Sequence, residues 1–464
     1  MKIRMLHFSV LALIAFNFLP GLNQESSIET NPSHANPITD NGKLANTKAL
    51  SAYSPGFSIG PQVRVSPLMY PAAHNYHPDV TYDWINDQFL VVWQQTWDSG
   101  VRQIYARYFS GSGQPLASAF RLNPELSYRE IIPKAVYNAT DDEFLVVFMY
   151  NSNGDTTTYD IRGRRLPSGC NSSACRPMIA YLSPVSGSES NPAVAWDYID
   201  NRYLVIYEVV SGGSSPLVNQ SLGYSCVDGG SMTKYGAITV GNNPEYSDLV
   251  YNPATDEFLV AWLENANTLR AARFDDGSGI DCIWQDRLWT IATTTSDWTM
   301  KNVSLATNWQ SRYLAAWEVH QPPSQINIRP YISARELDAA GDQLHSSLLY
   351  GSGGISSLLP DLAVQFRYGN PHDGRWIVVW QEALNSGDDI QADIWQIGSE
   401  TDNLSDFPIA NMGAWNARRP AVIAGRAGLM VVYEGRSTDP AEYQHIYMNF
   451  LYPIVQYLPL VIKQ

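Results

Sequence analysis

The stretch Phe89-Leu-Val-Val-Trp93 is one copy of a phrase that recurs along the chain. In each copy an aromatic or large apolar residue precedes three aliphatic or small residues, and an aromatic residue ends it. The other copies are Phe144-Leu-Val-Val-Phe148, Tyr203-Leu-Val-Ile-Tyr207, Phe258-Leu-Val-Ala-Trp262, Tyr313-Leu-Ala-Ala-Trp317, Trp376-Ile-Val-Val-Trp380 and Leu429-Met-Val-Val-Tyr433. Successive copies start 53 to 63 residues apart. Such spaced self-similarity is typical of repeat architectures.

Each phrase has similar surroundings. A shorter apolar run, often opened by proline as in Pro78-Asp-Val-Thr-Tyr82, precedes it. Asp, Asn and Gly residues lie between the two runs, which indicates a β-hairpin. A third run such as Ile104-Tyr-Ala-Arg107 follows, and a fourth such as Phe120-Arg-Leu122 completes the unit. Four short antiparallel strands per unit are typical of a β-propeller blade.

The sequence therefore predicts an all-β fold, a seven-bladed β-propeller over residues 52–451 with four antiparallel strands per blade. The seventh unit contains only three runs before the C-terminal tail. Its fourth strand is expected from Val63-Arg-Val-Ser66, which precedes the first unit and matches the fourth-strand position. An N-terminal strand that completes the last blade removes an open sheet edge, which would otherwise favour aggregation.

The aromatic–Leu-Val-Val–Trp and Ile-x-Ala-Arg phrases resemble the repeat of a class of secreted bacterial propeller proteins. The resemblance covers nearly the whole mature chain. It implies the fold and export, and it implies no particular reaction. Within the tail at 452–464, Tyr457-Leu-Pro-Leu-Val-Ile-Lys463 resembles a short tail on some secreted bacterial proteins. A packed terminal strand is the alternative there.

The N-terminus has the features of an export signal. Lys2 and Arg4 precede the apolar run Met5–Phe18, which is shorter than the roughly 20 residues of a transmembrane helix. A signal peptide is predicted at 1–23, with an uncleaved anchor as the alternative. Residues 24–51 are polar and nearly free of aromatics, which predicts a disordered linker.

The charge balance bears on partners. The chain has 45 acidic and 30 basic residues, a net charge of −15. Nucleic acid and anionic membrane surfaces require basic protein surfaces, so neither is expected as a partner. The sequence contains no second long apolar stretch, so we do not expect the mature chain to insert into a membrane. We expect a monomer that is secreted, extracellular or at the cell surface.

Four cysteines, an even number, favour disulfides in an exported chain. Cys170 and Cys175 are close in sequence, so a local bridge is expected between them. Cys226 ends the third strand of unit 3 and Cys282 follows the third strand of unit 4, so a bridge between these adjacent blades is an open possibility. A zinc site is the weaker interpretation, because paired C-x₂-C motifs and nearby histidines are absent from the sequence.

A candidate binding site lies at the channel mouth, where propeller loops gather. The residue after each repeated phrase is Gln94, Met149, Glu208, Leu263, Glu318, Gln381 or Glu434, which suggests a ring of carboxylates and amides. Aromatic residues could stack on a sugar there. The candidate ligand-binding residues are Trp97, Glu208, Glu264, Glu318, Glu382, Glu434, Trp415 and Arg418. The structural alternative is that these groups pair across strands or bind loop amides, because a residue that recurs in every blade usually serves the blade.

No metal site and no cofactor are predicted. His74 and His77 have no identifiable partner ligand, and acidic turns such as Asp275-Asp-Gly-Ser-Gly279 lack the ligand spacing of a calcium loop. Calcium is the one cation left open. The chain also lacks the Ser-x-Asp-x-Gly-x-Thr-Trp turn of sialidase-type propellers, a G-x-S-x-G elbow and a P-loop, so no catalytic residue is predicted.

The leading functional interpretation is a non-catalytic binding or scaffold module for a glycan or protein ligand at the channel mouth. The first alternative is a polysaccharide hydrolase or lyase that uses mouth carboxylates such as Glu208, Glu318 or Glu434. The second is a purely structural envelope protein whose mouth is filled by side chains.

Overall fold

A computed structural model describes the part of the chain that follows the N-terminal region. The chain divides into two units, Met1–Ser51 and Ala52–Gln464, and every described residue belongs to the second. The described residues are 57–67, 73–123, 129–151, 158–170, 178–183, 187–210, 219–228, 231–238, 243–275, 284–295, 297–310, 312–322, 324, 329–344, 348–350, 356–367, 370–384, 387–398, 406–410, 415–437 and 443–453. All regular structure in these ranges is β-strand. Within them, no helix is long and apolar enough to cross a membrane.

The strands fall into successive antiparallel groups, called repeats 1 to 7 below. Repeats 1 and 2 comprise β3 (Ala73–Asp83), β4 (Gln88–Trp97), β5 (Arg102–Ser110), β6 (Phe120–Arg121), and β7 (Arg129–Asn138), β8 (Glu143–Asn151), β9 (Asp160–Pro167), β10 (Met178–Tyr181). Repeats 3 and 4 comprise β11 (Ser188–Asp197), β12 (Arg202–Val210), β13 (Asn219–Asp228), β14 (Ser231–Ile238), and β15 (Pro244–Asn252), β16 (Glu257–Glu264), β17 (Thr268–Asp275), β18 (Trp284–Thr293). Repeats 5 and 6 comprise β19 (Thr299–Thr307), β20 (Arg312–His320), β21 (Tyr331–Asp338), β22 (Leu348–Tyr350), and β23 (Ser356–Arg367), β24 (Asn370–Leu384), β25 (Gly387–Gln396), β26 (Phe407–Ala410). Repeat 7 comprises β27 (Trp415–Ala424), β28 (Leu429–Ser437), β29 (His445–Pro453) and the early strands β1 (Phe57–Ile59) and β2 (Val63–Arg64).

Within each repeat the strands pair in chain order. Repeats 3 to 6 are separate four-stranded sheets, and one parallel pair, Arg102 with Arg129, joins repeats 1 and 2 into a single sheet. The repeated apolar phrase forms the second strand. Every residue from Phe89 to Trp93 is fully buried, because the strand packs on both faces. That packing explains why the phrase is apolar without alternation.

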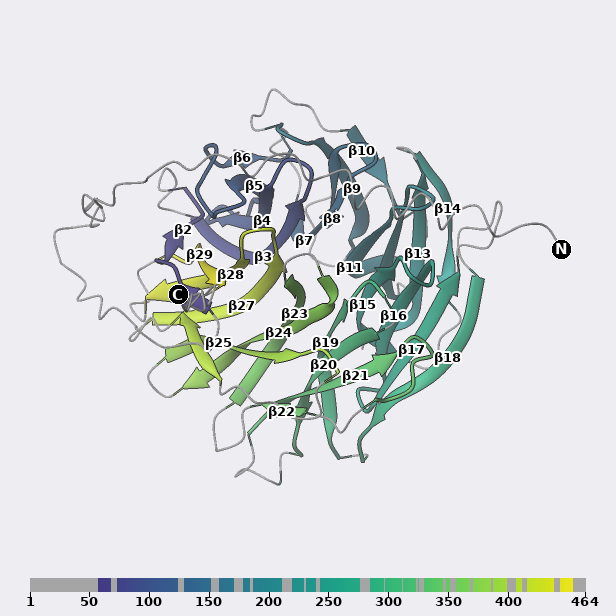
Figure 1. Ribbon diagram of the computed structural model, residues 1–464. Helices are drawn as coiled ribbons and strands as arrows, with labels where there is room; N and C mark the ends of the chain where they lie inside the picture. Colours follow the sequence, from purple (N-terminus) through teal and green to yellow (C-terminus); the bar gives the residue numbers. More distant parts are fainter. Residues whose placement is uncertain are drawn as a thin grey trace, which may run out of the picture. The chain divides into compact units, whose positions relative to one another are not determined.

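The first strands of successive repeats contact one another in order. β3 contacts β7, and the contacts continue through β11, β15, β19 and β23 to β27, which contacts β3 again. Figure 1 shows the repeats following one another from purple to yellow around these strands. The described residues therefore form a propeller-like all-β arrangement with the first strands at its centre.

The first and last described segments of the chain meet in one sheet. Val63 of β2 pairs with Met448 of β29, as expected for a strand completing the last repeat. The pairing extends further than the sequence indicated, because Phe57 of β1 also pairs with Pro453 at the end of β29. Both early segments thus cover the edge of β29.

A β-bulge recurs in the first strand of every repeat. In repeat 1 the register shifts between Tyr76 and Asp79, and the bulge residue His77 has φ of 50°. The corresponding positive-φ residues are His77, Ile132, Asn191, Tyr246, Asn302, Leu359 and Arg419. Non-glycine residues rarely adopt this conformation, so its recurrence marks a built-in feature of the repeat. The bulge residue and the residues that follow it line a central cavity.

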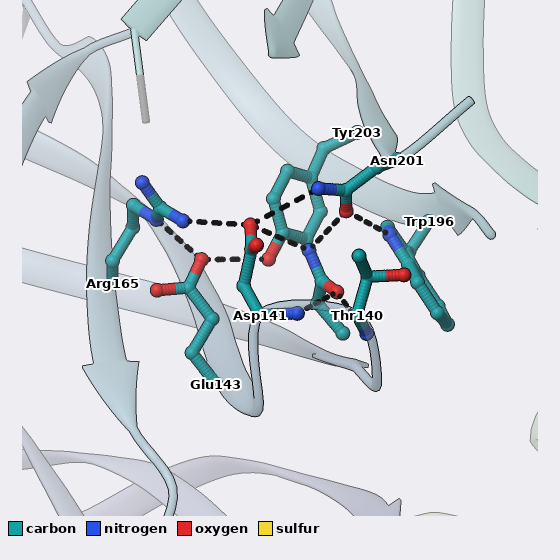
Figure 2. Close-up of polar contacts among 8 residues, drawn as sticks. Thr140, Asp141, Glu143, Arg165, Trp196, Asn201 and Tyr203 are labelled. Carbon is teal, nitrogen blue, oxygen red and sulfur yellow. Dashed lines mark hydrogen bonds and ion pairs between the residues drawn. The ribbon is translucent and has the colours of Figure 1, made fainter. Parts of the chain in front are cut away.

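Polar turns tie neighbouring repeats together at the opposite ends of the first strands. Figure 2 shows this network at the junction of repeats 2 and 3. Asn201 accepts a hydrogen bond from Asn138 Nδ2 at 2.8 Å and donates one to Asp141 Oδ2 at 3.2 Å. Tyr203 Oη donates to Glu143 Oε1 at 3.0 Å. These bonds join the first hairpin turn of repeat 2 to that of repeat 3.

Two of the four cysteines fall among the described residues. Cys170 and Cys226 are both buried, and neither is a free thiol. Cys175 and Cys282 lie outside the described residues, so the pairing of the four cysteines stays a prediction. The signal peptide, the linker and the tail from residue 454 onward also lie outside them.

Candidate functional site

A cavity of about 450 Å³ lies where the first strands meet. All seven first strands contribute to its wall, each with the bulge residue and the residues that follow. The bulge residues form one layer of the wall. The residue two positions after each forms a second layer, and these residues are Asp79, Lys134, Ala193, Asp248, Ser304, Asp361 and Ala421.

The second layer holds a cluster of charges around one lysine. Lys134 Nζ lies 3.3 Å from Asp79 Oδ1. Asp79, followed by Asp361 and Asp248, raises the pKa of Lys134 against the opposing effect of burial. Lys134 is therefore an ammonium ion that faces carboxylates from repeats 1, 4 and 6. Ser304 Oγ also donates to Asp361 Oδ1 at 3.2 Å.

Two of these carboxylates have strongly raised pKa values. Burial raises the pKa of Asp248 to about 6, although Lys134 counteracts it. Burial likewise raises the pKa of Asp361 to about 7, and the charges of Asp79 and Asp248 add to the rise. Carboxyl groups that titrate near neutral pH in a cavity can bind cations, accept hydrogen bonds or exchange protons.

Each aspartate of the cavity also holds the next repeat in place. Asp79 Oδ2 accepts the Ala135 backbone N–H at 2.8 Å. Asp248 Oδ2 accepts that of Leu305 at 2.8 Å, and Asp361 Oδ2 accepts that of Val422 at 2.7 Å. These bonds cross the junctions 1–2, 4–5 and 6–7.

The glutamates predicted at the mouth accept backbone N–H groups at three other junctions between repeats, 3–4, 5–6 and 7–1. Glu208 Oε1 accepts the N–H of the bulge residue Tyr246 at 2.7 Å. Glu318 Oε1 accepts that of Leu359 at 2.5 Å, and Glu434 Oε1 accepts that of His77 at 2.8 Å. Aspartate and glutamate therefore alternate around the centre. Among the described residues, only the junction of repeats 2 and 3 lacks such a carboxylate.

The second oxygens of these three glutamates are occupied as well. Glu208 Oε2 accepts Asn191 Nδ2 at 3.1 Å, and Glu318 Oε2 lies 2.6 Å from His320 Nε2. Glu434 Oε2 accepts Gln444 Nε2 and lies 3.4 Å from Arg419 Nη1. All three carboxylates are buried. This geometry matches the structural interpretation of the predicted ring, in which the carboxylates bind backbone amides.

The layer of bulge residues offers varied chemistry to a ligand. His77 is uncharged, because burial, followed by the charge of Arg419, lowers its pKa to about 3. Arg419 Nη1 pairs with Glu434 Oε1 at 3.2 Å while its side chain is 43% exposed. Tyr246 contributes a half-buried ring. Donors, acceptors, an aromatic ring and both charges therefore surround one cavity.

Glu208, Glu318 and Glu434 are not among the residues that line the cavity, and the remaining predicted residues with described side chains also lie outside its wall. Glu264 binds Arg270 Nε at 3.2 Å, and Glu382 accepts Gln391 Nε2 at 3.0 Å, each within its own repeat. Arg418 pairs with Asp388 of the preceding repeat. Trp97 packs on Tyr105 with ring centroids 6.0 Å apart. The side chain of Trp415 lies outside the described residues.

Sequence reasoning missed the charged layer formed by Asp79, Lys134, Asp248 and Asp361. Each occupies the position two residues after the bulge, where the other repeats carry Ala or Ser. The available signal was this variation at one position of an otherwise uniform repeat. Within the described ranges, no group of three or more His, Cys, Asp and Glu residues is arranged to hold a metal ion.

No family model and no curated protein matches the chain. Among solved structures, a protein of unknown function from Dyadobacter fermentans DSM 18053 is 12% identical with a TM-score of 0.48, covering 86% of this chain and 100% of that one. The polysaccharide lyase Uly1 is 8% identical with a TM-score of 0.47, covering 79% and 88%. The Hadza microbial sialidase Hz136 is 10% identical with a TM-score of 0.43, covering 76% and 74%. Similarity at this level decides neither the fold nor the activity.

Proposed function

We propose that the seven repeats are the blades of a closed seven-bladed β-propeller spanning residues 52–451, exported behind a signal peptide and a linker. Its function is to bind a glycan or protein ligand at the central cavity without catalysis, outside the cell or at its surface. The observation that carries this proposal is the occupation of Glu208, Glu318 and Glu434, whose oxygens all engage donors. Carboxylates committed in this way are poor acids and bases for catalysis.

The chemistry of the cavity favours a polar, hydroxyl-rich ligand such as the end of a glycan. Hydroxyl groups both donate and accept hydrogen bonds. The cavity provides Lys134 and Arg419 as donors, Asp248 and Asp361 as acceptors, and Tyr246 as an apolar surface. A small number of convergent polar groups around a cavity is typical of small-molecule sites.

Polysaccharide hydrolysis or lysis is the second candidate, and one observation favours it. Asp248 and Asp361 lie in the same cavity with pKa values of about 6 and about 7. A carboxylic acid that keeps its proton near neutral pH can protonate a leaving group, which glycoside hydrolysis requires. Asp248 and Asp361 line the cavity wall, whereas the three glutamates do not, so the aspartates would carry that chemistry although Asp361 also accepts two hydrogen bonds.

A glycan-array screen of the purified protein tests both candidates. We expect selective binding that Tyr246→Ala weakens, because its ring lines the cavity. Tyr235→Ala is the matched control, since that tyrosine is 49% exposed on β14 and does not line the cavity. Bound glycans are then incubated with the protein and analysed for cleavage. Cleavage lost in Asp361→Asn would favour the hydrolase or lyase, and the absence of glycan binding would favour a protein ligand or a structural role.

A further inference from the structure

Glu189 is a fully buried carboxylate at the junction of repeats 2 and 3. Its residue is 0% exposed, and within the part of the chain that the structure describes neither Oε1 nor Oε2 has a hydrogen-bond partner at bonding geometry. The hydroxyl of Ser183 is also buried and lies near Glu189 and Tyr207 without a hydrogen bond of good geometry to either. A buried polar group without a partner is rare, because burial without a hydrogen bond costs free energy.

Backbone hydrogen bonds bring three oxygen-bearing side chains together there. The Glu189 N–H donates to Tyr159 O at 2.7 Å, which places Asp160 beside the start of β11. The Leu182 N–H donates to Ile161 O at 3.2 Å, which places Ser183 beside Asp160. Burial raises the pKa of Glu189, the nearby Ser183 hydroxyl lowers it in part, and the charge of Asp160 adds to the rise. The group therefore contains two carboxylates and one hydroxyl.

The corresponding position one repeat earlier shows what this site lacks. Glu130 occupies the place of Glu189, and it is also buried. It accepts a hydrogen bond from Asn123 Nδ2 at 2.7 Å and another from the Ile104 N–H at 3.3 Å. Arg164 and Arg121 lie near enough to lower its pKa. At this junction the protein supplies every compensating donor and cation itself.

At the next junction a hydroxyl and a carboxylate replace the two amide side chains. In repeat 1 the Leu122 N–H donates to Ile104 O, and in repeat 2 the Leu182 N–H donates to Ile161 O. The residue after each leucine is therefore equivalent, so Ser183 corresponds to Asn123. By the same alignment Asp160 occupies the place of Gln103. An amide donor has thus become a hydroxyl, and a neutral amide has become a carboxylate. Glu189 therefore has a second carboxylate nearby, and a hydroxyl in place of an amide donor.

We propose that a divalent, oxygen-preferring cation of the Ca²⁺ type binds between repeats 2 and 3, held by the carboxylates of Glu189 and Asp160 and by Ser183 Oγ. Calcium takes six to eight oxygen ligands, including carboxylates and water. One divalent ion balances the two carboxylates. It also joins the two repeats at the junction where no carboxylate binds the next first strand. The cation thus replaces the missing protein bond.

Thermal unfolding of the purified full chain tests the site. Protein treated with chelator at pH 8 is titrated with CaCl₂, with MgCl₂, and with NaCl at matched ionic strength. We expect the Tm to rise with Ca²⁺ concentration, because an ion that binds only the folded state stabilises it. Mg²⁺ should act weakly, since it demands a more regular geometry. Calorimetric titration gives the affinity directly. A Tm that is the same in chelator and in CaCl₂ would overturn the proposal.

Three variants separate this site from other calcium effects. Glu189→Gln should weaken Ca²⁺ binding by more than about tenfold, the lower range of losses seen even for outer-shell partners. Glu130→Gln, the matched control one repeat earlier, should keep the Ca²⁺ response. Ser183→Asn places an amide donor beside Glu189, as Asn123 is beside Glu130, and should raise the Tm in chelator while reducing the Ca²⁺ response. A Glu189→Gln protein that retains the full response would place the ion elsewhere and contradict the proposal.

Discussion

At the scale of single residues, the carboxylates around the centre act on the backbone of the neighbouring repeat. Asp361, for example, bonds the Val422 N–H at 2.7 Å while facing Lys134 in the cavity. The same side chain therefore joins two repeats and sets the charge of the cavity. Substitutions there should affect stability and ligand binding together, and the two effects can be separated by pH.

The contribution of the two cavity aspartates to stability should fall as the pH rises from 5 to 8. Burial raises the pKa of Asp361 to about 7 and of Asp248 to about 6, above the usual value near 4. Between pH 4 and 7 the folded chain therefore binds more protons than the unfolded chain. The stabilisation is complete below about pH 4 and is lost as the pH rises through 7. Each unit of pKa shift corresponds to about 1.4 kcal/mol, less where the cavity is solvated.

Urea unfolding at pH 5 and pH 8 measures this effect. Asp361→Asn should reduce the difference between the two pH values, because asparagine can still accept the Val422 N–H. Asp98→Asn, at an exposed position, is the control and should leave the difference unchanged. A difference between the two pH values that is as large in Asp361→Asn as in the original protein would contradict the expectation.

Glu434 should be more sensitive to alanine than to glutamine. Its Oε1 accepts the His77 N–H at 2.8 Å across the junction between repeats 7 and 1. Alanine would leave that N–H and Arg419 without their acceptor, a loss of about 3 kcal/mol in the free energy of unfolding. Glutamine retains an acceptor oxygen, so Glu434→Gln should lose less. Chemical denaturation compares them, and equal losses would show that the hydrogen bond contributes little.

At the scale of the element, the first strand owes its function to its bulge. The bulge residue adopts positive φ in every repeat and turns the following residues into the cavity wall. Asn302 illustrates this, with φ of 47° and a side chain that donates to Glu318 Oε1 at 2.5 Å. Asparagine tolerates this conformation better than β-branched residues do.

Substitutions of Asn302 should separate backbone strain from the side-chain hydrogen bond. Asn302→Gly removes only the bond, since glycine adopts positive φ freely. Asn302→Val removes the bond and adds strain of about 1–3 kcal/mol. We therefore expect the valine variant to be the less stable of the two by that amount, measured by denaturant unfolding. A glycine variant as unstable as the valine variant would contradict the strained conformation.

The sequence was a good predictor of strands and a poor predictor of the bulge. The second strands were predictable because burial on both faces requires an unbroken apolar run. The bulge residues share no residue type, since they range from His77 to Leu359 and Arg419. The following proline in most repeats was the only regular signal. The charged residues of the cavity wall could not be predicted, because their residue type differs between repeats. The ring of glutamates was predictable because it recurs.

At the scale of the whole described unit, the pairing of β1 and β2 with β29 covers the edge of repeat 7. Removing residues 1–66 should expose that edge. An exposed strand edge favours pairing with other chains, so we expect a lower Tm and concentration-dependent association. Removing residues 1–51 is the matched control and leaves both strands in place. Light scattering and thermal unfolding provide the readout, and a monomeric 67–464 chain of unchanged Tm would contradict the role of these strands.

The pairing of Phe57–Ile59 with the end of β29 also has a consequence in time. These residues are made before any of the repeats, and their partner strand is made after all of them. Every repeat can form its own hairpins during synthesis, because those contacts are local. Completion of repeat 7 must wait for the final residues of β29. A ribosome stalled before β29 is made would therefore hold a chain whose first six repeats can form while its two ends are still apart.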